Sequence, residues 1–89
     1  MTDAEIYTAA IRTYGETAQE NMCIEECAEL IQAINKKHRG LAHNIAEEIA
    51  DCEITLEQLK IINNCAAEVK EIHRLKMQRL FNKVFDMCL

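Results

Sequence analysis

Two clusters of carboxylates stand in the middle of the sequence, EECAE at residues 25–29 and EEIAD at residues 47–51. Each cluster lies within an apolar run that has the helical period, so we expect both on α-helices. At about 100° per residue, Glu26 and Glu48 fall inside the apolar stripes of their helices, and no Lys or Arg shares the middle of either stripe. A buried carboxylate is costly unless it is paired or bound to a cation. The sequence therefore predicts a divalent-cation site, and hard oxygen ligands favour Mg²⁺ or Mn²⁺.

A second carboxylate follows one turn after each of these, Glu29 after Glu26 and Asp51 after Glu48. Both lie about 60° to the same side of the central carboxylate. The competing interpretation is that Glu26 and Glu48 lie at the edge of the apolar faces and extend into water. We favour the cation site because two pairs with the same i, i+3 phase occur on successive helices.

Helical periodicity extends over most of the chain and predicts an all-α fold. The four expected helices span residues 3–14, 18–38, 45–62 and 66–87. Their connections are short, so we expect an antiparallel four-helix bundle or part of one, within a single domain of residues 1–89.

Local signals set the expected ends of these helices. The expected breaks are Gly15, Gly40 and Asn63-Asn64. Thr17 with Glu20, and Asn44 with Glu47, have the spacing of capping boxes. They should therefore open the second and third helices.

Composition narrows the possible partners and the compartment. The net charge is −5, which argues against nucleic acid as a partner. Residues 16–58 carry ten acids against three bases, whereas residues 66–89 carry five bases against three acids. An acidic half beside a basic last helix suits a polyphosphate held between a metal ion and cationic side chains. Nothing resembles a signal peptide or a membrane span.

The five cysteines lack CxxC spacing, and most fall on or near apolar stripes. We interpret them as small buried hydrophobic residues of a protein in a reducing cytoplasm. A soft-metal site at Cys23 and Cys27 is a weaker alternative.

The two acidic motifs also resemble a known family, the MazG-like all-α nucleoside triphosphate pyrophosphohydrolases. That family carries E-E-x-x-E and then E-x-x-D, which here are Glu25-Glu26-x-x-Glu29 and Glu48-x-x-Asp51 with 18 residues between them. The resemblance covers nearly the whole chain and is greatest to the short single-domain members from Gram-positive bacteria and their phages. The other recurring features are Tyr14-Gly15, Met22, Leu56-Glu57-Gln58-Leu59 and a basic last helix.

The resemblance implies roles for individual residues. The Mg²⁺ ligands would be Glu26, Glu29, Glu48 and Asp51. Glu25 completes the motif and would orient water or a ligand; it, or one of the four, would accept the proton.

Other residues would contact the substrate. Lys76 and Arg79 on the last helix would hold the phosphates, although a solvated basic face is an equally good interpretation of these two. Some members stack the base on a Trp, which this chain lacks, so Tyr14 and Gln19 are the candidates for base contact.

The implied reaction is hydrolysis of a nucleoside triphosphate between the α- and β-phosphates, which yields the monophosphate and pyrophosphate. The implied assembly is a homodimer or homotetramer, in agreement with the small core that 89 residues can form.

Three other functions compete with this one. A ferritin-like di-iron bundle would need E-x-x-H motifs, and the chain has none. A non-catalytic helical interaction module of the same fold is a second alternative, against which the intact carboxylates argue. Phosphoribosyl-ATP pyrophosphohydrolase is an alternative within the same fold.

Overall fold

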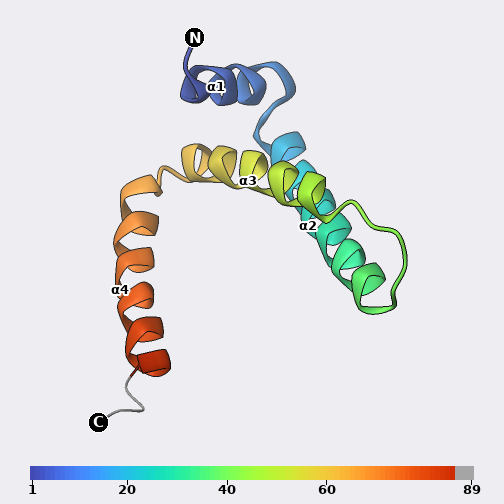
Figure 1. The fold of residues 1–89 in the computed structure, drawn as a ribbon. Helices are drawn as coiled ribbons and strands as arrows, with labels where there is room; N and C mark the ends of the chain where they lie inside the picture. Colours follow the sequence, from blue (N-terminus) through green and yellow to red (C-terminus); the bar gives the residue numbers. More distant parts are fainter. Residues whose placement is uncertain (86–89) are drawn as a thin grey trace.

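The computed structural model describes residues 1–85, which form four α-helices and no β-strand. The helices are α1 (Asp3–Tyr14), α2 (Glu16–His38), α3 (Ile45–Ile62) and α4 (Ala66–Phe85), as Figure 1 shows. The all-α prediction is confirmed, and three of the four predicted helix starts are correct. The predicted last two residues of the fourth helix, Asp86 and Met87, lie outside the described residues.

The start of α2 differs from the prediction. α1 begins as expected, with the Thr2 Oγ1 accepting a hydrogen bond from the Glu5 N–H at 3.2 Å. Gly15 is both the C-cap of α1 and the N-cap of α2. Its φ is +92°, a backbone conformation that residues with a side chain rarely adopt. This single-residue turn starts α2 at Glu16, so the capping box predicted at Thr17 does not form.

The start of α3 is where the sequence predicts it, but its cap is different. Asn44 is the N-cap residue, yet its side chain accepts no backbone hydrogen bond. Its Nδ2 instead donates to the carboxylates of Glu47, at 3.3 Å, and Glu48, at 2.8 Å. The capping box predicted at Asn44 is therefore wrong in its hydrogen bonds, because the Asn44 side chain binds carboxylates of the acidic cluster instead.

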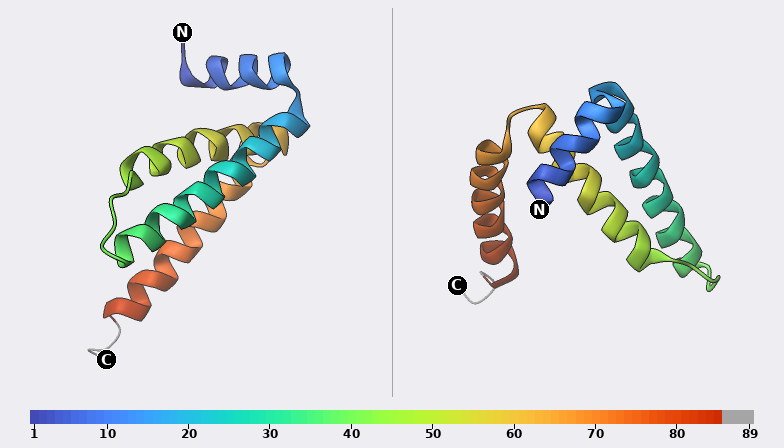
Figure 2. Two further views of the ribbon diagram at one scale, coloured as in Figure 1. Left: turned by 90° about the vertical axis from the view of Figure 1, so that its right-hand side faces the viewer. Right: turned by 90° about the horizontal axis from the view of Figure 1, so that it is seen from above.

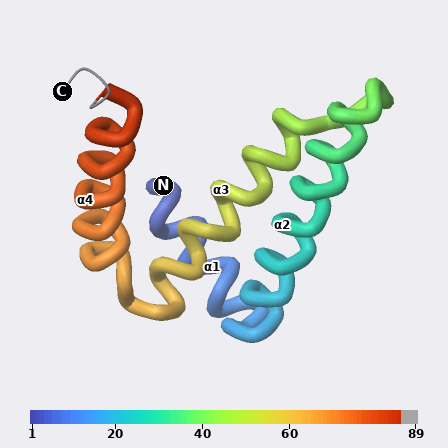
Figure 3. The backbone as a smooth tube through the Cα atoms, turned by 90° about the horizontal axis from the view of Figure 1, so that it is seen from below, coloured from blue at the N-terminus to red at the C-terminus, as the bar shows by residue number. Residues whose placement is uncertain are grey.

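α2 and α3 form an antiparallel hairpin and the most extensive helix contact of the chain (Figures 2 and 3). α2 ends in a Schellman turn, in which the Leu41 N–H donates to the Lys36 carbonyl at 2.9 Å, and the chain returns at once. Small residues allow the helices to approach closely: the buried apolar side chains in the described part of the chain are Cys23, Ala33 and Cys52. α1 crosses one end of this hairpin.

Enlarging the contact between α2 and α3 should destabilise the protein. Ala33 is only 2% exposed, so Ala33→Leu must push the helices apart or strain side chains, at a cost of about 1–3 kcal/mol. Urea unfolding at fixed protein concentration measures the change. Ala28→Leu, on the exposed side of α2, is the matched control and should change stability little; equal effects of the two would contradict this packing.

α4 leaves the hairpin. Its only helix contact within the described chain is with α3, and it lies apart from α2 (Figures 1 and 3). The four helices of one chain therefore do not close into a single bundle. None of the described helices has an apolar stretch of the length that a bilayer crossing requires.

Candidate metal centre

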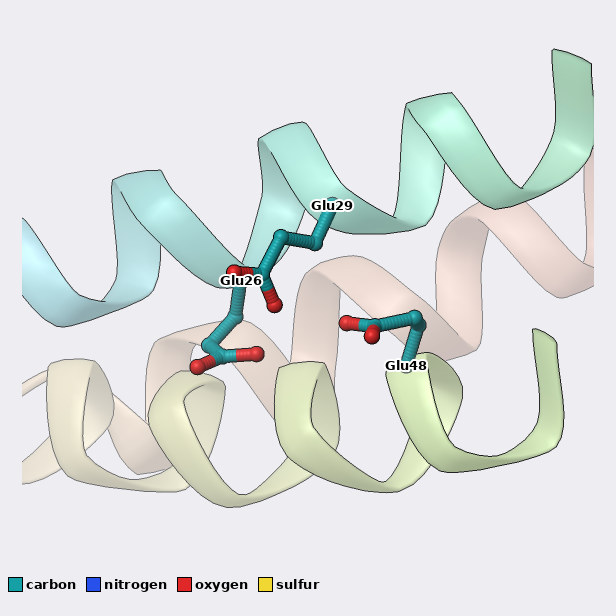
Figure 4. A group of neighbouring side chains, drawn as sticks. All are labelled: Glu26, Glu29 and Glu48. Atoms are coloured by element: carbon teal, nitrogen blue, oxygen red, sulfur yellow. The ribbon is translucent and has the colours of Figure 1, made fainter. Parts of the chain in front are cut away.

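Three carboxylates converge between the two helices of the hairpin. Glu26 and Glu29 extend from α2 and Glu48 extends from α3, and Figure 4 shows all three pointing into the space between the ribbons. One oxygen from each lies within 4.8 Å of the others. Oxygens around an octahedral Mg²⁺ at about 2.1 Å lie about 3–4 Å apart, so small side-chain rotations would bring these three into range.

Glu48 is the most unusual member because it is buried, with 6% of its surface exposed. The Asn44 amide holds its Oε1 at 2.8 Å, whereas its Oε2 is buried without a hydrogen-bond partner. The Oε2 of Glu26 is likewise buried without a hydrogen-bond partner. Unpartnered buried oxygens are costly, and the two carboxylates that carry them converge with a third. Three converging carboxylates have the donor chemistry of a hard-cation site.

Asp51 and Glu25, which were predicted as site residues, are not part of this group. Asp51 is half-buried one turn along α3, and it lines a cavity of about 150 Å³ with Glu26, Thr55 and Gln58. Its oxygens are outside the group of three. Glu25 is exposed on α2 and faces solvent.

The pKa values of two of these carboxylates, Glu26 and Glu48, are raised. The pKa of Glu26 is raised from 4.5 to about 7, chiefly by loss of solvation and then by the charges of Glu29 and Asp51. Burial also raises the pKa of Glu48; the Asn44 hydrogen bond opposes this, and Glu29 and Asp51 add to it. Without a cation, burial disfavours the charged form of both groups.

The metal-free protein should lose stability as pH rises from about 4.5 to about 7. In the folded protein Glu26 keeps its proton up to a pKa of about 7, whereas an unperturbed Glu loses it near 4.5. The folded state binds more protons in this window, so the free energy of unfolding falls as pH rises and levels off above about 7.

Urea unfolding in chelator, for wild type and Glu26→Gln, measures this contribution because other groups cancel in the difference. The variant should show a smaller fall with pH, and Mg²⁺ should flatten the wild-type curve because it displaces the protons. Identical pH dependence in the two proteins would contradict the raised pKa of Glu26.

Gln19 lies away from solvent, against the opposite helix. It is 7% exposed, and its Nε2 donates a hydrogen bond to the Oε1 of Gln58 at 2.6 Å. Gln58 was not among the predicted site residues. The signal that could have identified it is its position seven residues after Asp51, on the same side of α3 and beside the same cavity.

The other predicted substrate contacts do not join the cluster within one chain. Tyr14 is 68% exposed at the end of α1. Lys76 and Arg79 are exposed on α4, which has no contact with α2.

The thiols pack against the same helices. Cys23 and Cys52 are buried, and the Cys52 Sγ donates to the backbone carbonyl of Glu26 at 3.3 Å. Burial raises the pKa of Cys27, and it raises that of Cys52 to about 11, so both remain protonated thiols. The predicted role of small buried residues is confirmed for Cys23 and Cys52, whereas Cys27 and Cys65 are half-buried and Cys88 lies outside the described residues.

The candidate centre therefore consists of Glu26, Glu29 and Glu48, with Asp51 beside them. Comparison of the chain with family models, with curated proteins and with solved structures finds no match.

Proposed function

We propose that the protein is a Mg²⁺-dependent nucleoside triphosphate pyrophosphohydrolase, which cleaves between the α- and β-phosphates and releases the monophosphate and pyrophosphate. The observation that carries the proposal is Glu48, which is 6% exposed, has one oxygen without a hydrogen-bond partner, and converges with Glu26 and Glu29. A carboxylate in this position is unfavourable in the empty protein, so it is best explained by a cation that binds there.

The donor set favours a hard cation. Glu26, Glu29, Glu48 and Asp51 would hold it, and all four offer carboxylate oxygens. The histidines that a di-iron site would need lie elsewhere, at the end of α2, in the following loop and on α4. Mg²⁺ is therefore the favoured ion, with Mn²⁺ as the substitute.

The spacing of the two acidic motifs, which resembles the MazG-like pattern, supports phosphoanhydride hydrolysis over other uses of Mg²⁺. When bound, Mg²⁺ supplies charge neutralisation at the phosphates and polarises the α-phosphorus. Glu25 and Glu29 are exposed to solvent. They would orient a water molecule and accept its proton. Lys76 and Arg79 would steady the leaving pyrophosphate if α4 is brought to the site by another copy.

The proposal includes the assembly. An antiparallel bundle of the MazG-like type would be closed by helices of a second copy, in a homodimer or homotetramer, because α4 leaves the hairpin of its own chain. The free thiols at Cys23, Cys27, Cys52 and Cys65 suit a reducing, cytoplasmic setting.

Pyrophosphate release across the eight common ribo- and deoxynucleoside triphosphates tests the reaction. We expect Mg²⁺-dependent release of pyrophosphate with the matching monophosphate, and no signal in chelator. Diphosphate and orthophosphate as products would overturn the assigned bond. Mg²⁺ binding by calorimetry without turnover, on this panel and on phosphoribosyl-ATP, would favour the non-catalytic interaction module.

A further inference from the structure

Three of the cysteines meet in the contact between α2 and α3. Cys23 and Cys27 lie one turn apart on α2, about 40° from each other around the helix, and Cys52 comes from α3. The Cys27 thiol is a hydrogen-bond partner of both other thiols. The proposed carboxylate site uses none of these sulfur atoms, so their convergence calls for a separate explanation.

The Cys52 sulfur lies against the backbone of α2. Its Sγ donates to the backbone carbonyl oxygen of Glu26 at 3.3 Å. This carbonyl belongs to the peptide group that joins Glu26 to Cys27, and standard peptide dimensions place its oxygen about 3 Å from the Cys27 Cα. The Cys52 sulfur is therefore no more than about 6 Å from the Cys27 Cα.

Small side chains favour the close helix spacing that a disulfide between α2 and α3 needs. A disulfide joins Cα atoms that lie about 4.4–6.8 Å apart, and large side chains between two helices would hold them farther from each other. The buried apolar residues of this contact, within the described part of the chain, are Cys23, Ala33 and Cys52. Since the thiols of Cys27 and Cys52 are already hydrogen-bond partners, rotation of the two side chains would bring the sulfurs to bonding distance.

Helix geometry excludes the other pairing within the cluster. Residues i and i+4 of an α-helix have their Cβ atoms about 5–6 Å apart. A disulfide needs them about 3.5–4.5 Å apart, so a bond between Cys23 and Cys27 would distort α2. Cys52 is the partner that Cys27 can reach with both helices intact.

The exposure of the thiols sets the order of reaction. Cys27 is half-buried, whereas Cys23 and Cys52 are each only 5% exposed. A small oxidant from solvent therefore meets Cys27 first. A second thiol beside an oxidised cysteine resolves it to a disulfide, and Cys52 is in that position.

We propose that Cys27 and Cys52 are a redox-active pair, which hydrogen peroxide oxidises to a disulfide that joins α2 to α3. The peroxide first converts the Cys27 thiol to a sulfenic acid and leaves as one water molecule. The Cys52 sulfur then attacks the Cys27 sulfur, and the sulfenic oxygen leaves as a second water molecule. Two thiols thus lose two electrons and two protons to one peroxide. This step does not depend on the proposed nucleotide hydrolysis.

The reduced pair is the resting form. Burial raises the pKa of Cys27 and raises that of Cys52 to about 11, so little of the reactive thiolate is present at neutral pH. We therefore expect oxidation to be slower than that of free cysteine, so that the pair responds to sustained peroxide. The disulfide would close the chain from residue 27 to residue 52 and restrict the unfolded state. It should raise the urea midpoint by at least about 1 M, and dithiothreitol should reverse the change.

Peptide mapping of the peroxide-treated full chain tests the pairing. After free thiols are alkylated, a protease that cuts after Glu separates the three cysteines, because Glu25 and Glu26 lie between Cys23 and Cys27. We expect one linked product, residues 27–29 joined to residues 49–53, from a chain that keeps its 10.2 kDa mass without reductant. A link at Cys23 in place of Cys27, a link only between copies, or no link in the folded protein would overturn the proposal.

Two controls show whether the folded geometry selects this pair. Cys65→Ser makes the same change as Cys27→Ser at another half-buried thiol, which lies just before α4 and outside the cluster. We expect Cys65→Ser to keep the link and the urea shift, and Cys27→Ser to lose both. Wild type oxidised in urea should give a mixture of pairings. Equal behaviour of the two variants, or the same mixture from native and urea-treated wild type, would mean that the fold does not direct the bond.

The mapping of native wild type does not depend on whether either variant folds.

Discussion

Glu48→Gln should lower Mg²⁺-dependent pyrophosphate release at least about 100-fold, since even residues that only support a metal ligand cost about 10–100-fold when removed. Glu48 is the buried member of the cluster; its Oε2 has no hydrogen-bond partner, and one of its oxygens lies within 4.8 Å of oxygens of Glu26 and Glu29. An amide has one oxygen and no charge, so the variant offers a weaker donor at the position least accessible to a replacement water. The steady-state rate of pyrophosphate release and the Mg²⁺ affinity measured by calorimetry should fall together.

The same variant separates loss of the site from loss of the fold. Burial raises the pKa of Glu48, so its charge opposes folding in the empty protein, and Gln imitates the neutral form. Metal-free Glu48→Gln should therefore unfold at the wild-type temperature or above it. Glu20→Gln makes the same chemical change at an exposed position of α2 and should keep full activity. Wild-type Mg²⁺ affinity in Glu48→Gln would contradict the site.

The second large effect is expected on stability, at the buried amide pair. Gln58→Leu removes the acceptor that lies 2.6 Å from the Gln19 Nε2, while Gln19 remains 7% exposed. A buried donor without a partner costs the full loss of its hydration, so we expect a loss of about 1–3 kcal/mol. Urea unfolding at fixed protein concentration measures it.

A double-mutant cycle identifies the cause of this loss. Gln19→Leu with Gln58→Leu replaces both partners, so the pair should cost much less than the sum of the single changes. Gln32→Leu, at an exposed position of α2, should stay within about 0.5 kcal/mol of wild type. Additive losses in the double variant would mean that the amide pair contributes nothing.

The helices and the convergence of Glu26, Glu29 and Glu48 could be predicted because both follow from local periodicity. The phase of a residue on a helix depends on the chain within a few turns of it. Two helices joined by a short loop must also face each other with their apolar sides. These constraints sufficed to bring carboxylates from the first and second motifs together.

The remaining features, which are hydrogen-bond partners and the direction of a helix, are not determined by the local sequence pattern. The Asn44 side chain could accept a hydrogen bond from a backbone N–H or donate one to a carboxylate. It donates to Glu47 and Glu48, which lie close to it. The Gln19–Gln58 bond joins residues 39 positions apart, so it depends on how the helices pack. The direction of α4 depends on a turn at Asn64, which takes a φ of +48° without a glycine.

The location of the cluster within one hairpin also bears on how the protein folds. Glu26, Glu29 and Glu48 lie within 23 positions of one another, and all belong to the contact between α2 and α3. Closing so short a segment costs little chain entropy, so the hairpin can form before α4 makes its contact with α3. Its carboxylates repel one another as they meet, so Mg²⁺ should speed refolding of the hairpin, an effect visible in stopped-flow circular dichroism even where no nucleotide is present.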